Sequence, residues 1–175
     1  MKIAKLIACC VLTAASIWSC KKEVKVNNSQ LNAADNDFIA LAATINAAET
    51  ATAKVAVAKT IDTMVLSFAK QMILDHSSVQ GDLKIMGNLV GFTVKDTIDA
   101  AHAAIISHLD SLTGRSFDSA YIRNELTSHQ ETMQFCIKEL NTGQQLHVTA
   151  YANNLLQNEQ LHYQNADTIA VFNKY

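Results

Sequence analysis

Proline is missing from all 175 residues of this chain. Because proline breaks the interior of a helix and is frequent in turns, its absence permits long uninterrupted helices and argues against a turn-rich β-sandwich. Hydrophobic residues make up 49% of the chain and charged residues 17%, which excludes a disordered chain. The formal net charge is −2, and the sequence shows neither a basic stripe nor an aromatic platform, so nucleic acid is not an expected partner. The sequence therefore predicts one all-α domain.

Residues 1–19 have the order of a lipoprotein signal peptide. Lys2 and Lys5 come first, an apolar run too short for a comfortable membrane span follows, and "SIWSC" ends at Cys20. A small residue directly before a cysteine resembles the lipobox of bacterial lipoproteins, which implies that residues 1–19 are removed and that Cys20 carries lipid. An ordinary secretory signal and an uncleaved anchor are the alternatives.

The next segment, residues 20–36, is polar and lacks an apolar period. We interpret it as the lipidated cysteine and a flexible tether. Several acyl chains on one cysteine make a stable membrane anchor. We therefore expect a membrane contact through Cys20 and a location in the cell envelope, at the outer membrane facing the periplasm. Cys136 is then the single cysteine of the mature domain, so no intramolecular disulfide is expected.

Residues 37–172 show helical periodicity throughout. Breaks at "TID", Gly91, Gly114 and Gly143 divide this part into five expected helices, at 37–59, 63–89, 98–113, 118–141 and 145–172. Four long helices with one short helix after the second long one describe a ferritin-like four-helix bundle, in which the short helix connects two hairpins.

Polar residues interrupt the apolar stripe of each long helix near its middle. The interrupting residues are Glu49, His76, His129, Glu159 and His162. Their offsets from the expected hairpin turns agree within about two helical turns. We therefore expect these five side chains to meet in one layer across the core.

Such a layer has two interpretations, because buried carboxylates and imidazoles are costly unless they are paired or bound to metal. The first is a structural network in which the three histidines hydrogen-bond the two glutamates and fix the helix register. The second is a metal site. Glu159 and His162 form the Glu-x-x-His pair used by carboxylate-bridged di-metal bundles. Imidazole with carboxylate suits iron, zinc, manganese or copper.

Three stretches resemble one bacterial family. These stretches are "FAKQMILDHSSVQGDLK", "FDSAYIRNELTSHQETMQF" and "NEQLHYQNA". They resemble the family named domain of unknown function 4142, and the resemblance covers residues 36–170. It implies an exported, all-helical, ferritin-like protein and no established activity. The di-iron pattern is incomplete, because Ile73 occupies the glutamate position before His76 and His129 stands where a carboxylate is expected. A single-metal or atypical di-metal site is compatible with these residues.

The expected function is thus non-enzymatic: a lipid-anchored binding or envelope-stress module. The alternative is a redox or metal-sequestering protein that uses the five layer residues. No phosphate loop or nucleophile elbow is present, and we predict no catalytic residue. Asp75 adjoins His76 but points about 100° away on a helix, so we interpret it as lying at the edge of the stripe.

Overall fold

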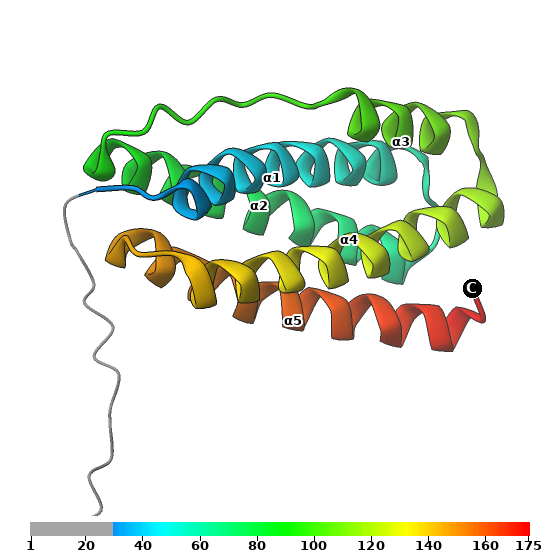
Figure 1. Ribbon diagram of the computed structural model, residues 1–175. Helices are drawn as coiled ribbons and strands as arrows, with labels where there is room; N and C mark the ends of the chain where they lie inside the picture. The colour runs from blue at the N-terminus through cyan, green and yellow to red at the C-terminus, as the bar shows by residue number, and fades with distance from the viewer. Residues whose placement is uncertain (1–29) are drawn as a thin grey trace, which may run out of the picture.

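A computed structural model describes residues 30–175 (Figure 1). This part contains five helices and no strand: α1 (Ala33–Lys59), α2 (Thr63–Val90), α3 (Ala100–Ser111), α4 (Gly114–Thr142) and α5 (Leu146–Asn173). The all-α prediction is confirmed. The expected signal peptide, Cys20 and most of the expected tether lie outside the described residues. Among the described helices, none combines the length and the apolar character that crossing a membrane requires.

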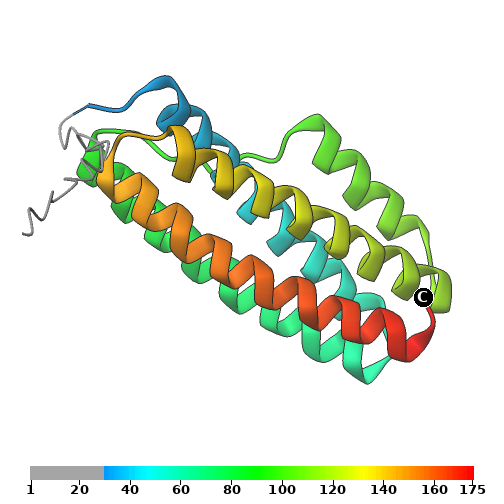
Figure 2. The same ribbon diagram turned by 60° about the horizontal axis from the view of Figure 1, so that its bottom comes forward.

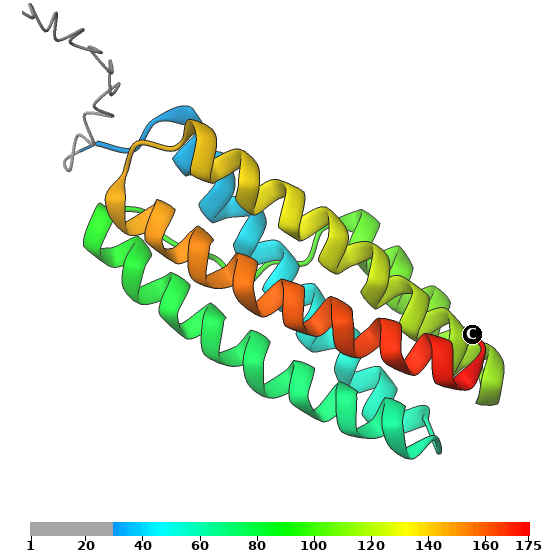
Figure 3. The same cartoon turned by 90° about the horizontal axis from the view of Figure 1, so that it is seen from below.

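The long helices form two hairpins. α1 packs mainly on α2, and α4 packs mainly on α5; further contacts between α1 and α4 and between α2 and α5 close the bundle (Figures 2 and 3). The short helix α3 lies outside, against α1 and α4, and an extended segment after α2 runs along the bundle to reach it (Figure 1). Gly91 ends α2 with a left-handed φ of 77°, a conformation that glycine adopts without strain. The predicted ferritin-like topology is confirmed.

Two helix starts differ from the predicted ones by four residues, and the other boundaries agree within two residues. α1 begins at Ala33, so residues 33–36, which we had assigned to the tether, are helical. The cause is a capping box: Asp35 N donates to the side chain of Asn32 at 2.8 Å, and Asn32 N donates to the side chain of Asp35 at 2.7 Å. α4 begins at Gly114 rather than at residue 118, directly after the short helix.

Two apolar clusters fill the bundle, one toward each end. The cluster nearer the α1–α2 turn includes Phe68, Met72, Tyr121, Ile122 and Ile169. The cluster nearer the α4–α5 turn includes Phe38, Leu83, Cys136, Tyr151 and Leu155. Burial of one large apolar side chain contributes about 1.5–3 kcal/mol. Packing on both sides therefore holds the middle of the four long helices in fixed positions.

Candidate metal centre

A layer of histidines and glutamates separates the two apolar clusters. All four long helices contribute to it: Glu49 from α1, His76 from α2, Glu125 and His129 from α4, and Glu159 and His162 from α5. Each of these side chains is buried, with at most 3% of the residue exposed. The five residues predicted to meet in one layer do lie together, and Glu125 joins them.

The acidic and imidazole groups approach one another in pairs. His129 Nδ1 lies 2.7 Å from Glu159 Oε2, and its Nε2 lies 3.5 Å from Glu125 Oε2. His76 Nε2 and Glu49 Oε2 form a buried ion pair at 2.6 Å. Ser128 Oγ donates to the other oxygen of Glu49.

His162 is held by a carboxylate outside the layer. Its Nε2 lies 2.9 Å from Asp75 Oδ2. Because an ionised carboxylate only accepts hydrogen bonds, Nε2 carries the ring proton. Burial and the charge of His76 lower the pKa of His162, so the ring is neutral and Nδ1 keeps its lone pair. That Nδ1 is buried and has no hydrogen-bond partner among the described residues.

His76 repeats this arrangement with a different acceptor. Its Nδ1 lies 3.2 Å from the side-chain oxygen of Asn46, whose amide nitrogen donates elsewhere, so Nδ1 is the donor. Nε2 is then the inward-facing nitrogen, and it lies 2.6 Å from Glu49 Oε2. Both imidazoles are therefore oriented through one nitrogen, and the inward nitrogen of His162 is the one without a partner among the described residues.

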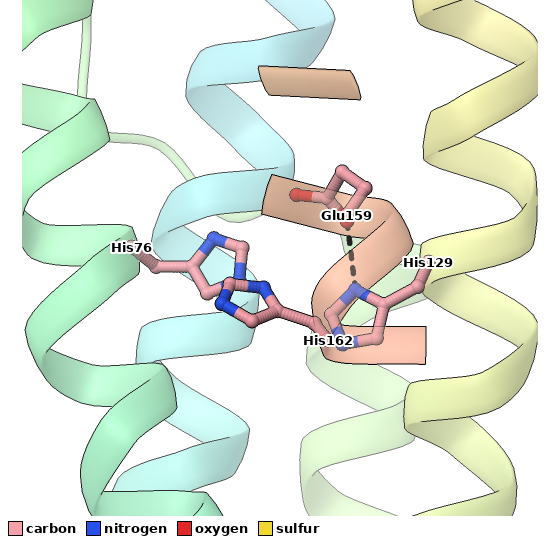
Figure 4. Close-up of side chains that lie close together, drawn as sticks. All are labelled: His76, His129, Glu159 and His162. Atoms are coloured by element: carbon pink, nitrogen blue, oxygen red, sulfur yellow. Dashed lines mark hydrogen bonds and ion pairs between the residues drawn. The ribbon is translucent and has the colours of Figure 1, made fainter. Parts of the chain in front are cut away.

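The three rings converge between α2, α4 and α5 (Figure 4). The His162 ring centroid lies 5.3 Å from those of both His76 and His129, and the latter two rings stack at 6.0 Å. One set of ligand atoms within 4.8 Å of one another comes from His76, His129, Glu159 and His162, and we call it the inner group. A second set, the outer group, comes from Glu49, Glu125 and His129.

Without a metal, protons balance the charge of this layer. Burial opposes ionisation of Glu49, but the charges of His76 and His129 outweigh it and hold the pKa of that carboxyl well below its usual range. Conversely, burial opposes the charged form of both histidines, yet Glu49 raises the pKa of His76 and that of His129. Burial raises the pKa of Glu125, which favours its neutral form. Protons on the imidazole rings thus supply the positive charge that a metal cation would otherwise supply.

Two members of this region were missed or misread in the sequence. Apolar periodicity along α4 places Leu126, Met133 and Leu140 on the buried face. In the structure their neighbours Glu125, Thr132 and Glu139 are buried instead, and Leu140 is 38% exposed. The spacing of Glu125 four residues before His129 was the available signal. The interpretation of Asp75 as an edge residue was incomplete, because its carboxylate reaches His162 across the α2–α5 contact.

The fold and the layer define a ferritin-like helical bundle with a buried histidine–carboxylate centre. Residues 21–169 match the profile of the family described as domain of unknown function (DUF4142), and the chain belongs to this family. The resemblance seen in the sequence is thereby confirmed. A search among curated proteins finds no sequence relative.

Solved structures share the fold. The crystal structure of a DUF305 fragment from Deinococcus radiodurans is 14% identical, with a TM-score of 0.71, and the alignment covers 80% of this chain and 97% of that one. CopM in its Cu(I)-bound form is 15% identical, with a TM-score of 0.67 over 81% of this chain and 97% of that one. CopM in its Ag-bound form is 14% identical, with a TM-score of 0.64 over 78% of this chain and 94% of that one. At such identities the similarity concerns the fold alone.

Proposed function

We propose that this domain binds one divalent transition-metal ion in the inner group, without an enzymatic reaction. The observation that carries the proposal is the pair of oriented histidines. In metal sites a ligating imidazole commonly donates its other N–H to a carboxylate or carbonyl oxygen, and His162 with Asp75 and His76 with Asn46 have this arrangement. A purely structural network would have no reason to leave the buried, inward Nδ1 of His162 without a partner among the described residues.

The donor set favours an ion of intermediate softness. Three imidazoles and one carboxylate suit Zn²⁺ or Cu²⁺, whereas Cu⁺ prefers thiolate and thioether ligands. Copper and silver appear in the names of the CopM structures, and these names support metal binding by a bundle of this shape. Because the inner ligand atoms span up to 4.8 Å, and a tetrahedral Zn²⁺ site needs about 3.4 Å between ligands, small side-chain shifts would complete the coordination.

Sequestration suits this centre better than catalysis. Every ligand of the inner group is buried. The cavity that reaches the layer has a volume of about 190 Å³, which is smaller than the roughly 300–1,000 Å³ of typical small-molecule pockets. An ion fits such a space, whereas a drug-sized organic molecule does not.

The anchor remains part of the proposal. The order of Lys2, Lys5, apolar run and "SIWSC" supports acylation of Cys20 and a location at the outer membrane facing the periplasm. Cys20→Ala should abolish labelling by a fatty-acid analogue and release the protein from membranes. Membrane retention of the unlabelled variant would contradict lipidation.

Metal content and thermal unfolding test the centre. The wild-type protein, loaded with Zn²⁺ or Cu²⁺ and dialysed, should retain one ion per chain. The ion should stabilise the fold by about 2.7 kcal/mol at a hundredfold excess over the dissociation constant. His162→Ala should lose both the ion and this gain, because it removes one imidazole of the inner group. His147→Ala is the matched control, since His147 lies on the same helix but is exposed.

If the layer is a structural network that binds no metal, the opposite results are expected in both experiments. If the layer only fixes helix register, added metal and chelator should leave the wild-type unfolding temperature unchanged, and the dialysed protein should contain no stoichiometric ion. That result would reject the metal centre. An ion retained equally by wild type and by His162→Ala would place the binding site elsewhere.

A further inference from the structure

A cavity leads from the protein surface to the buried layer. It lies between α1, α3 and α4, has a volume of about 190 Å³, and is lined by Glu49, Thr52, His102, Ser128 and Glu131 among others. Glu131 is exposed, and the side chain of His102 is 26% exposed. Glu49 is 3% exposed and belongs to the outer group. The lining therefore runs from solvent-accessible residues to a ligand of the centre.

The inner end of the cavity presents a carboxylate of the outer group. Glu49 Oε2 lies 2.6 Å from His76 Nε2, while Ser128 donates to the other oxygen of Glu49. Thr52 Oγ1 connects the same wall to Glu125, at 3.5 Å from Oε1. Glu49 and Glu125, together with His129, make up the outer group, and His129 also belongs to the inner group. A continuous series of ligand atoms thus joins the cavity to the proposed metal site.

The outer part of the cavity suits a cation. Glu131 contributes a negative charge, and no lysine or arginine is among the residues that line it. Asp99 Oδ1 lies 2.8 Å from His102 Nδ1, so the carboxylate fixes the ring through one nitrogen and leaves Nε2 as the nitrogen able to take a ligand. A cavity lined by one sign of charge raises the local concentration of the opposite ion.

We propose that this cavity is the port through which the metal ion enters and leaves the centre. The ion passes the surface residues His102 and Glu131, binds transiently to the outer group, and transfers to the inner group through their shared ligand His129. This inference rests on the proposed metal-binding function. It adds that α3 forms one wall of the route, which gives this helix a role besides connecting the two hairpins.

Exchange kinetics test the port. Thr127 lines the cavity, is exposed, and donates its hydroxyl to a carbonyl of its own helix. Thr127→Trp should obstruct the cavity without touching a ligand. We expect the rates of Zn²⁺ association and of chelator-driven removal to fall together by about tenfold, with the dissociation constant unchanged, because a barrier on the route affects both directions equally. Stopped-flow competition with a chromophoric chelator measures both rates.

Thr168→Trp is the matched control. Thr168 is also exposed and donates to a carbonyl of its own helix, but it lines a different cavity, between α2 and α5, whose lining contains no inner or outer group residue. This variant should exchange Zn²⁺ at the wild-type rate. Circular dichroism and the unfolding temperature establish that both variants are folded.

A milder change covers the case in which Thr127→Trp does not fold. Glu131→Gln removes one negative charge from the cavity, so Zn²⁺ association should slow and the difference should shrink at high salt. Wild-type rates in Thr127→Trp, or in Glu131→Gln where the first variant is unfolded, would overturn the port and leave metal binding intact. Equal slowing in Thr127→Trp and Thr168→Trp would also overturn it. Absence of Zn²⁺ binding by the wild-type protein would instead reject the metal centre itself.

Discussion

Two regions of this bundle bury carboxylates, and they satisfy them differently. At the end near the α4–α5 turn, Asp35 is fully buried and accepts backbone N–H groups from Asn32, Gln144 and Gln145 at 2.7, 3.0 and 3.2 Å. In the middle of the bundle, the glutamates of the layer face imidazoles instead. The first region uses backbone donors, and the second uses side chains from four separate helices.

A proton completes the first region. Glu139 is 2% exposed and lies beside Asp35. Burial, together with the negative charge of the neighbouring Asp35, raises the pKa of Glu139 to about 8. The acid is then neutral near pH 7 and needs no cation beside it. This cluster therefore serves to hold α1, α4 and the following turn together.

Protons balance the charge of the central layer but leave one of its lone pairs, on His162 Nδ1, without a partner among the described residues. The lowered pKa of His162 keeps its Nδ1 unprotonated, and the charge of His76 disfavours any added proton there. The comparison teaches that burial of acids is a weak indicator of function. The stronger indicator is a buried lone pair that lies among other possible ligand atoms and that protonation leaves unsatisfied.

The largest expected effect comes from removing one histidine of the layer. His129→Ala in the metal-free protein should lower the free energy of unfolding by about 3–5 kcal/mol, because breaking a buried ion pair leaves uncompensated carboxylates. Urea denaturation at pH 7 measures this loss. Glu139→Gln under the same conditions should change stability little, since a neutral amide replaces a neutral acid. Equal losses of unfolding free energy in the two variants would contradict the proposed difference between the two regions.

The second effect is the pH dependence of metal binding. Glu49 raises the pKa of His76 and that of His129 in the metal-free protein, so both rings keep their protons to higher pH, and a metal must displace them. Affinity for Zn²⁺ should therefore fall by about a hundredfold per pH unit below those pKa values, or about 2.7 kcal/mol. Chelator competition between pH 6 and 8, with calorimetry in buffers of different ionisation enthalpy, measures the affinity and the proton release. A dissociation constant that does not vary with pH would be incompatible with ligation by these histidines.

The smallest effect concerns the carboxyl pair. The pKa of Glu139 is raised from 4.5 to about 8 on folding, so the folded protein holds a proton that the unfolded chain has lost. The contribution of Glu139 to the free energy of unfolding should therefore be greatest below pH 4.5. It should decline as the pH rises to 8, by at most about 1.4 kcal/mol per pH unit. Glu139→Gln should remove this decline and should be more stable than wild type at pH 9. Urea denaturation at pH 6 and 9 provides the measurement, and parallel curves for the two proteins would contradict the assignment.

The sequence predicted much of the fold because its signals are local. The absence of proline and the glycines at 91 and 143 mark long helices and their ends. The missed start of α1 was also a local signal, since Asn32 and Asp35 stand at capping-box spacing. Periodicity along α2 and α5 indicated that His76 and His162 face inward, and both are buried.

What only the tertiary structure decided is which groups meet. Periodicity leaves the rotation of a helix uncertain by part of a turn, so Leu126 and Glu125 could not be ranked until α4 packed against its neighbours. The carboxylate of Asp75 became a partner of His162 through the contact between α2 and α5, 87 residues apart in the chain. Thus the sequence by itself determined the helices and the inward polar residues, because hydrogen bonding and apolar periodicity act within a few residues. The tertiary structure decided the ligand groups and the cavity beside them, because these depend on distances between helices that no local pattern encodes.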